Sequence, residues 1–188
     1  HNEHRYLGRT LDSIYARTPP EVLREVIVVD DASEPPLAAT LRGYPQVRLL
    51  RHEDRRGLIK SKTEGGNAAT ADMIMFLDGH VKPEANWWRP MLKHMNENYR
   101  RVVVPVIPIL DGNTWEPNLH AVGIKMMFDW TLFFQWFEDH NDLVPCMSGG
   151  LFGITRRWWH ESGEYDYGMM MWGAENIEQS IRVWLCGG

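Results

Sequence analysis

The feature that most constrains the fold is an alternation of short apolar runs with helical patterns in the first half of the chain. Runs with the length and composition of buried strands cover Glu25–Asp30, Val47–Arg51, Met73–Leu77 and Val102–Val106. Helices are predicted over Leu7–Arg17, Pro36–Tyr44, Leu58–Ala69 and Glu84–Tyr99. This order predicts an α/β fold with a mainly parallel central sheet, right-handed crossovers and helices on both faces.

The second half of the chain is less regular. Aromatic residues recur at near-helical spacing between Trp115 and Asp142, and we expect most of them in the core: Trp130, Phe133, Phe134, Trp136 and Phe137. A strand is predicted over Leu151–Ile154. An amphipathic helix is predicted over Asn176–Cys186, with Ile177, Ile181, Val183, Trp184 and Leu185 available for burial and Gly187 as its C-cap.

Composition excludes several classes of protein. At 188 residues the length suits one domain, and 44% hydrophobic residues are ample for a core. The net charge of -5 argues against a nucleic-acid-binding protein. No apolar run approaches the roughly 18 residues of a membrane-spanning helix. Cys146 and Cys186 fit neither a zinc spacing nor a disulfide framework, so two buried thiols are expected.

Polar residues follow three of the predicted strands. They are Asp30-Asp31, the basic run from Arg51 to Gly57, and Asp78-Gly79-His80. Because parallel strands place their carboxyl ends on one edge of a sheet, where ligands bind, these groups should converge. A carboxylate can accept from a ribose or base edge, and arginines can bind phosphates. The combination predicts a site for transfer from a nucleotide-sugar.

Asp78 and His80 form half of a possible metal site. Side chains two apart on an extended chain point the same way, so a carboxylate and an imidazole share one side. Taken alone, such a pair often arises by chance. Asp30-Asp31 could likewise be a helix cap or a turn, and the basic residues could form a solvated face. The convergence of all three favours the functional interpretation.

Two glycine-containing segments fit the same site. Gly149 and Gly150 precede a predicted strand and would let a ligand approach the backbone, although a bulge or tight turn explains them equally well. Glu175 and Asn176 begin the last predicted helix, where either could serve as its cap. Alternatively, Glu175 could hold sugar hydroxyls, with Trp172 as an apolar wall.

Taken together, the motifs resemble those of the polypeptide N-acetylgalactosaminyltransferases. The resemblance rests on an ordered set that covers nearly the whole chain: HNE, TPP, EVIVVDD, RRGLIKSK, FLDGH, FDW, SGGLF, WGAEN and VWLCGG. It implies a GT-A fold and transfer of GalNAc from UDP-GalNAc to Ser or Thr of an acceptor polypeptide. This transfer is the first step of mucin-type O-glycosylation. The resemblance further implies that it proceeds with retention of configuration, uses Mn2+ and takes place in the Golgi lumen.

The resemblance also implies roles for individual residues. Asp78 and His80 would be metal ligands, Asp31 would contact the uridine, and Arg55 and Lys62 would line the nucleotide site. Gly149, Gly150 and Trp172 would surround the GalNAc, with Glu175 and Asn176 as the catalytic residues. No side chain is an obvious nucleophile, and in the family the leaving diphosphate helps to take the acceptor proton.

The chain departs from the family pattern at several places. Arg56 replaces a Glu, Lys62 a common Arg, and Ala174 a Gly, while the stretch from Phe128 to Ser148 is short. Lysine keeps the charge of arginine but loses its bidentate fork. We expect residues 1–188 to be a partial catalytic domain. The first strand, a third metal ligand, the catalytic loop, the lectin domain and the parent protein's membrane anchor would all lie outside it.

A partial domain of this kind is expected to be inactive by itself. Two alternatives stay open. One is a non-catalytic binding module, or pseudoenzyme, of the same fold, which the changes at Arg56, Lys62 and Ala174 favour slightly. The other is a GT-A transferase that uses a different UDP-sugar, since Ala174 lies on the sugar side.

Overall fold

The computed structural model describes residues 1–139 and 141–188. His140, in the aromatic stretch, lies outside the described residues. The elements are, in chain order, α1 (Leu7–Arg17), β1 (Val26–Asp31), the 3-10 helix η1 (Leu37–Ala39), β2 (Val47–His52), α2 (Leu58–Ala68), β3 (Met73–Phe76), α3 (Trp88–Glu97), β4 (Ile107–Leu110), β5 (Pro117–Gly123), β6 (Lys125–Phe128), β7 (Phe134–Phe137), β8 (Phe152–Thr155), α4 (Arg156–Glu161) and α5 (Glu175–Leu185).

The pair β1 and β2 has helices on both faces, as the sequence predicts. The two strands are parallel, with Val26 opposite Val47 and Asp31 opposite His52. Successive side chains of a strand point to opposite faces. Val26 and Val28 accordingly pack with α1, whereas Ile27 belongs to the core beneath α2. The alternation of apolar residues on this one strand therefore fixes two helix layers.

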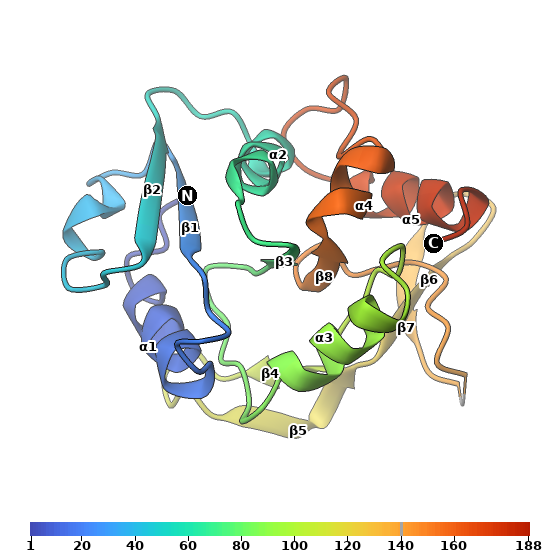
Figure 1. Cartoon of the computed structure of the whole chain (residues 1–188), viewed down its shortest axis with the longest axis horizontal. Coiled ribbons are helices and arrows are strands. Elements are labelled where there is room, and N and C mark those ends of the chain that lie inside the picture. The colour runs from blue at the N-terminus through green and yellow to red at the C-terminus, as the bar shows by residue number, and fades with distance from the viewer. Residues whose placement is uncertain (140) are drawn as a thin grey trace.

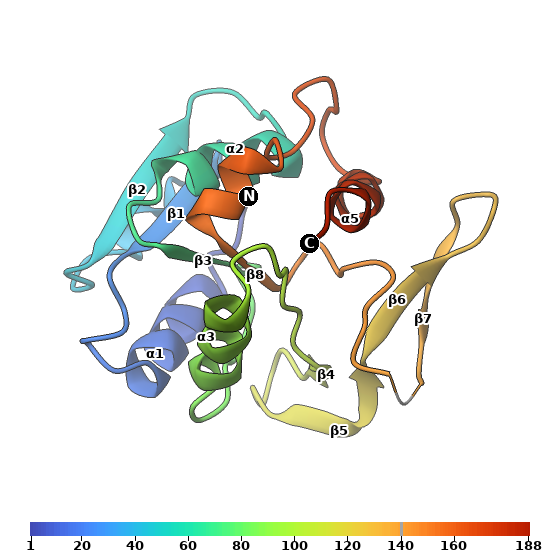
Figure 2. The ribbon, with the colours of Figure 1, turned by 45° about the vertical axis from the view of Figure 1, so that its right-hand side comes forward.

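The centre of the molecule is built on β3 and β8. These strands are antiparallel, and Phe76 lies opposite Phe152 on the face covered by α2 and α4, where Trp159 is fully buried. On the other face, methionines of α3 approach Gly153 closely. Figures 1 and 2 both show α2 and α4 on one side of these strands and α3 on the other. Burial of each large side chain here stabilises the fold by about 1.5–3 kcal/mol.

The prediction of a mainly parallel sheet is only partly right. Among the described residues β1–β2 is a parallel pair, while β3–β8, β4–β5 and β6–β7 are antiparallel. Apolar periodicity indicates that a strand exists but carries no information about the direction of its partner. The strand predicted over Val102–Val106 is a single bridge from Val103 to Gly153. Pro105 has no N–H to extend that pairing.

Two predicted helices are shorter than expected. The segment Pro36–Tyr44 contains only η1, and Gly43 takes a positive φ of 96° near its end. The helix predicted over Glu84–Tyr99 begins at Trp88, because Asn86 has φ of 60°, which is incompatible with a helix. Helix α4 was not predicted, although Thr155 caps it by accepting from the N–H of Trp158 at 3.1 Å.

The prediction of a buried, near-helical aromatic stretch is wrong. The segment forms β5 and the hairpin β6–β7, and Trp130 and Phe133 are 104% and 66% exposed. The hairpin turn is set by Asp129, whose Oδ1 accepts from the N–H of Thr131 at 2.7 Å and of Phe133 at 3.2 Å. This Asx-type turn places the aromatic residues on a projecting ribbon, not in a helix.

The last helix matches its predicted position but buries less than expected. Ile177 and Val183 are buried, while Ile181, Trp184 and Leu185 are exposed. Cys146 is buried as expected, but Cys186 is exposed. Within residues 1–139 and 141–188, no helix combines the length and apolarity needed to cross a bilayer.

Candidate functional site

The ends of β1 and β2 are joined by a buried carboxylate. The Asp31 Oδ1 accepts from the N–H of Arg56 at 2.7 Å and lies 2.8 Å from His52 Nδ1, while its Oδ2 accepts from the N–H of Gly57 at 2.9 Å. Burial raises the pKa of Asp31, but these donors outweigh it and hold the pKa below its usual value. Asp31 thus fixes the connection from Glu53 to Gly57, which we call the β2–α2 loop, and retains one acceptor position on Oδ2.

Arg55 lies in the middle of this loop. Its side chain is exposed and has no hydrogen bond or ion pair with the part of the chain that the structure describes. The neighbouring Asp30 points away from Asp31 and is fully buried, accepting from the N–H groups of Ser33 and Leu37, each at 3.0 Å. Asp30 therefore supports the fold, and Arg55 is a side chain that the loop leaves available for a ligand.

Lys62 links α2 to the end of β3. Its Nζ donates to the carbonyl oxygen of Gly149 at 2.5 Å and lies 3.4 Å from Asp78 Oδ1. Burial lowers the pKa of Lys62, and the nearby charges of Asp78 and Glu175 oppose that shift without cancelling it. The largely buried ammonium group therefore contacts Asp78 and is within the range of the charge of Glu175.

Gly149 and Gly150 form the floor between those carboxylates. A Cβ at Gly150 would lie 2.4 Å from Asp78 Oδ2, and one at Gly149 would lie 3.0 Å from Glu175 Oε1. A side chain at Gly150 would displace the Asp78 carboxylate, and one at Gly149 would push Glu175 by a few tenths of an ångström. The two glycines therefore bring acidic groups from two different parts of the chain to one strip of backbone.

Asp78 and His80 lie on the rim, where the sequence predicts a metal. Asp78 is 33% exposed and His80 is 56% exposed at the side chain, and His80 Nδ1 lies 3.2 Å from Glu3 Oε1. No group of three or more His, Cys, Asp or Glu side chains could hold a metal ion within residues 1–139 and 141–188. A carboxylate and an imidazole fit a divalent cation such as Mn2+, provided that a ligand or water fills the other coordination positions.

The residues at the start of α5 differ in their environments. Glu175 is buried, and its Oε2 accepts from the N–H of Gly173 at 2.9 Å. The Asn176 amide donates to the carbonyl oxygen of Met147 at 3.1 Å, so it holds the segment before the glycines. Trp172 is 68% exposed. Of the residues predicted around the sugar, Glu175 is the one whose carboxylate reaches the glycine floor.

The structure brings most of the predicted residues together and adds others. Lys62, Asp78, Glu175 and the two glycines form one cluster, while Arg55 belongs to the adjoining β2–α2 loop, which Asp31 holds from the end of β1. Sequence reasoning missed three neighbours: Glu3, Glu64 and Tyr165. Burial, followed by the charges of Glu175 and Asp78, raises the pKa of Tyr165. His52, which directly follows a predicted strand, is among the groups that the sequence predicts to converge at this edge.

The β2–α2 loop is also tied to the segment before α5. Gly57 has φ of 91° and pairs with Met171, whose Cα would lie 2.4 Å from a Cβ at position 57. The carbonyl oxygen of Met171 also accepts from the N–H of Ile59 at 3.2 Å. The nucleotide side and the sugar side of the predicted site are therefore in direct backbone contact.

Comparison with known proteins gives a consistent result. The model of glycosyl transferase family 2 matches residues 1–159. Human polypeptide N-acetylgalactosaminyltransferase 14 is 39% identical over 202 residues, which cover 100% of this chain and 37% of the relative. Polypeptide N-acetylgalactosaminyltransferase 4 of Caenorhabditis elegans is 36% identical over 204 residues, which cover 100% of this chain and 34% of the relative. The chain thus spans about a third of the length of these curated relatives.

Solved structures agree with the fold. A crystal structure of GalNAc-T7 with UDP, GalNAc and Mn2+ matches with a TM-score of 0.83 and 30% identity, over 96% of this chain and 37% of that one. A mannosyltransferase from Pyrobaculum calidifontis, in complex with GDP-Man and Mn2+, shares the fold with a TM-score of 0.69 at 16% identity. The match covers 100% of this chain and 50% of that one. The expected GT-A glycosyltransferase fold is confirmed. The chain belongs to glycosyl transferase family 2, and the resemblance of its motifs to polypeptide N-acetylgalactosaminyltransferases is confirmed.

Proposed function

We propose that this chain is the donor-binding part of a retaining transferase that moves GalNAc from UDP-GalNAc to Ser or Thr of a polypeptide. One observation carries the proposal. Lys62, Asp78 and Glu175 gather around Gly149 and Gly150 in a chain whose relatives over its full length are polypeptide N-acetylgalactosaminyltransferases. The neighbouring GalNAc-T7 structure, which holds UDP, GalNAc and Mn2+, supports the same donor and metal.

The charges divide the site into two halves. On the nucleotide side, Arg55 provides a guanidinium for the diphosphate, and the remaining acceptor position of Asp31 serves the uridine. Asp78 and His80 hold Mn2+, which when bound supplies positive charge to the diphosphate. Lys62 adds positive charge beside Asp78. Because the site is largely shielded from solvent, the electrostatic attraction between this charge and the diphosphate is stronger than it would be in water.

The sugar side is shaped by small residues and one carboxylate. Gly149 and Gly150 let the sugar ring reach the backbone, since a side chain there would displace the carboxylates of Glu175 and Asp78. Glu175 accepts hydrogen bonds from sugar hydroxyls, Asn176 fixes the approach to the glycines, and Trp172 offers an apolar wall. With two metal ligands of the His, Cys, Asp and Glu type in the described residues, we expect this chain to bind the donor but turn it over slowly or not at all.

The setting follows from the same resemblance. We infer that the parent protein works in the Golgi lumen, on Ser- and Thr-containing acceptor polypeptides. The experiment that decides the function is binding of UDP to the chain by isothermal titration calorimetry, with Mn2+ and with EDTA. The matched variants are Asp78→Asn at the carboxyl end of β3 and Asp72→Asn, exposed just before its amino end.

We expect UDP binding that needs Mn2+, is lost in Asp78→Asn and is unchanged in Asp72→Asn. Absence of UDP binding under all conditions would refute the proposal. A panel of UDP-sugars then distinguishes the proposed GalNAc-transferase from a transferase for another sugar. Preference for UDP-GalNAc supports the proposal, and preference for another UDP-sugar supports the alternative transferase. Transfer to a Ser/Thr peptide by the chain would show that two protein metal ligands are enough.

A further inference from the structure

A buried histidine bridges two carboxylates next to the nucleotide side of the site. His52 is 4% exposed. Its Nδ1 lies 2.8 Å from Asp31 Oδ1, and its Nε2 lies 2.7 Å from Glu64 Oε2. A neutral imidazole has a single N–H and can donate to only one of these oxygens. Both contacts become hydrogen bonds only when the ring carries both protons.

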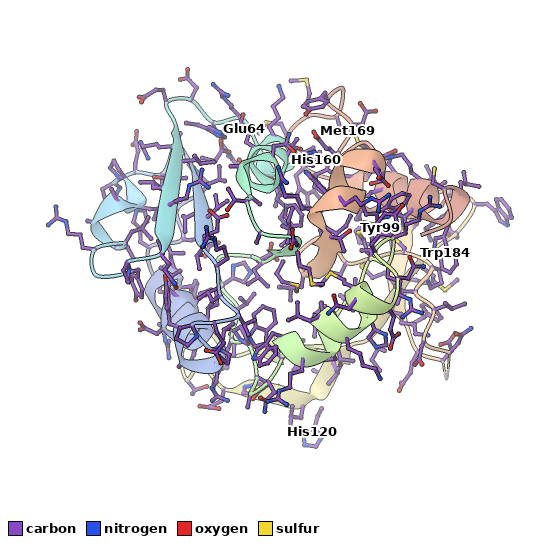
Figure 3. The ribbon with its side chains drawn as sticks, viewed as in Figure 1. Glu64, Tyr99, His120, His160, Met169 and Trp184 are labelled. Carbon is purple, nitrogen blue, oxygen red and sulfur yellow. The ribbon has the colours of Figure 1, made fainter. Side chains whose placement is uncertain are left out.

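The groups around His52 come from three elements and balance in charge. Asp31 ends β1, His52 ends β2, and Glu64 projects from α2 on the side that faces β2 (Figure 3). The Arg56 guanidinium also bonds to Glu64 Oε1 at 3.0 Å. Two carboxylates thus face one imidazolium and one guanidinium. The other titratable side chain in contact with these residues in the described chain is His1, whose Nδ1 lies 2.7 Å from the backbone carbonyl oxygen of Asp31.

The bridge lies where it can set the position of the β2–α2 loop. The carboxylate that His52 holds is the same one that accepts from the backbone N–H groups of Arg56 and Gly57. Arg55 is the residue just before them, and Gly57 continues the contact to Met171. A change in the charge of His52 therefore acts on both sides of the donor site through a few direct bonds.

We propose that His52 is a positioning residue for donor binding, whose imidazolium clamps Asp31 and Glu64 together and so fixes the β2–α2 loop that presents Arg55. This inference rests on the proposed function for its ligand, but the clamp itself can be measured without any ligand. It adds to the site a residue that does not touch the donor and that acts through Asp31.

The clamp has a defined pH dependence. Burial acts to lower the pKa of His52, but the hydrogen bonds and charges of Asp31 and Glu64 outweigh it and raise the pKa above its ordinary value. The clamp is therefore complete below about pH 6.5, the ordinary pKa of histidine, and is lost as the pH rises through the raised value. The pKa of Glu64 is lowered, so its charge persists in mildly acidic solution.

The first test is hydrogen exchange of the Arg56 and Gly57 amide protons by NMR, in the whole chain without ligand. His52→Gln should speed their exchange about tenfold or more, because a buried charged hydrogen bond is lost. The matched control is His160→Gln, which removes a His–Glu contact of 2.9 Å on α4. Unchanged exchange in His52→Gln would overturn the clamp.

The second test is UDP affinity with Mn2+ between pH 5.5 and 8.5. The pH dependence of the metal ligands and of UDP is common to both chains, so the informative quantity is the ratio of the affinity of the unmodified chain to that of His52→Gln. We expect this ratio to be well above one at pH 6 and to fall toward one as the pH rises. Glu64→Gln, which keeps the Asp31 contact, should move the midpoint to lower pH, whereas a purely structural role would lower affinity at all pH values alike. Faster exchange with unchanged UDP affinity and pH profile would overturn the positioning role.

Discussion

Gly150 offers a way to disturb the site without disturbing the fold. A Cβ at this position would lie 2.4 Å from Asp78 Oδ2, and ordinary contact begins at 3.4 Å, so Gly150→Ala must displace that carboxylate by about 1 Å. Metal–ligand distances tolerate only about 0.2 Å. Gly150 is absent from the positive-φ residues, so the backbone accepts alanine. Because Asp78 is a partly exposed side chain, we expect the free energy of unfolding to change by less than about 1 kcal/mol.

The displaced carboxylate should weaken Mn2+-dependent UDP binding at least about tenfold, or about 1.4 kcal/mol. Calorimetric titration measures the affinity, and urea unfolding measures the stability. Gly8→Ala in α1 is the control, because its Cβ would meet nothing nearer than 3.8 Å. If Gly150→Ala bound UDP as the unmodified chain does, the carboxylate of Asp78 would not be part of the metal site.

Three further predictions concern stability. Ala174→Gly should stabilise the chain by about 0.5–1 kcal/mol in urea unfolding, because Ala174 has a left-handed φ of 67°; a loss of stability would contradict this. Asp31→Asn should flatten the acid side of the stability–pH curve, because donors outweigh burial in lowering the pKa of Asp31, so its contribution is present above about pH 4 and lost as the pH falls. An unchanged curve would contradict it. Trp159→Ala should cost about 3–5 kcal/mol and Trp130→Ala less than about 0.5 kcal/mol, since they are 0% and 104% exposed; equal costs would contradict the exposed hairpin.

The first half of the fold could be predicted because each strand carries its own signal. The alternating apolar residues of β1 determine which of them face α1 and which face α2, and Asp31 follows directly at the sheet edge. The convergence of Asp31 and His52 follows from parallel register alone. A local pattern is enough wherever the structure depends on the strand itself.

The second half could not be predicted in the same way. The near-helical spacing of Phe133 and its neighbours is a property of the sequence, but the Asx turn at Asp129 decides that they lie on a hairpin. The antiparallel pairing of β3 with β8 depends on a partner almost eighty residues away. Likewise, the contact of Lys62 with Gly149 joins α2 to a distant loop, and no local pattern encodes that distance.

A divalent metal and UDP should bind together at the carboxyl end of β3. The most direct measurement is paramagnetic broadening of backbone amide signals when Mn2+ is added to the chain in the presence of excess UDP. We expect loss of the amide signals of Asp78, Gly79, His80, Gly149 and Gly150. The signal of Asp72, which lies before the other end of the strand, should be less affected. Broadening centred elsewhere, with these five signals intact, would contradict the account.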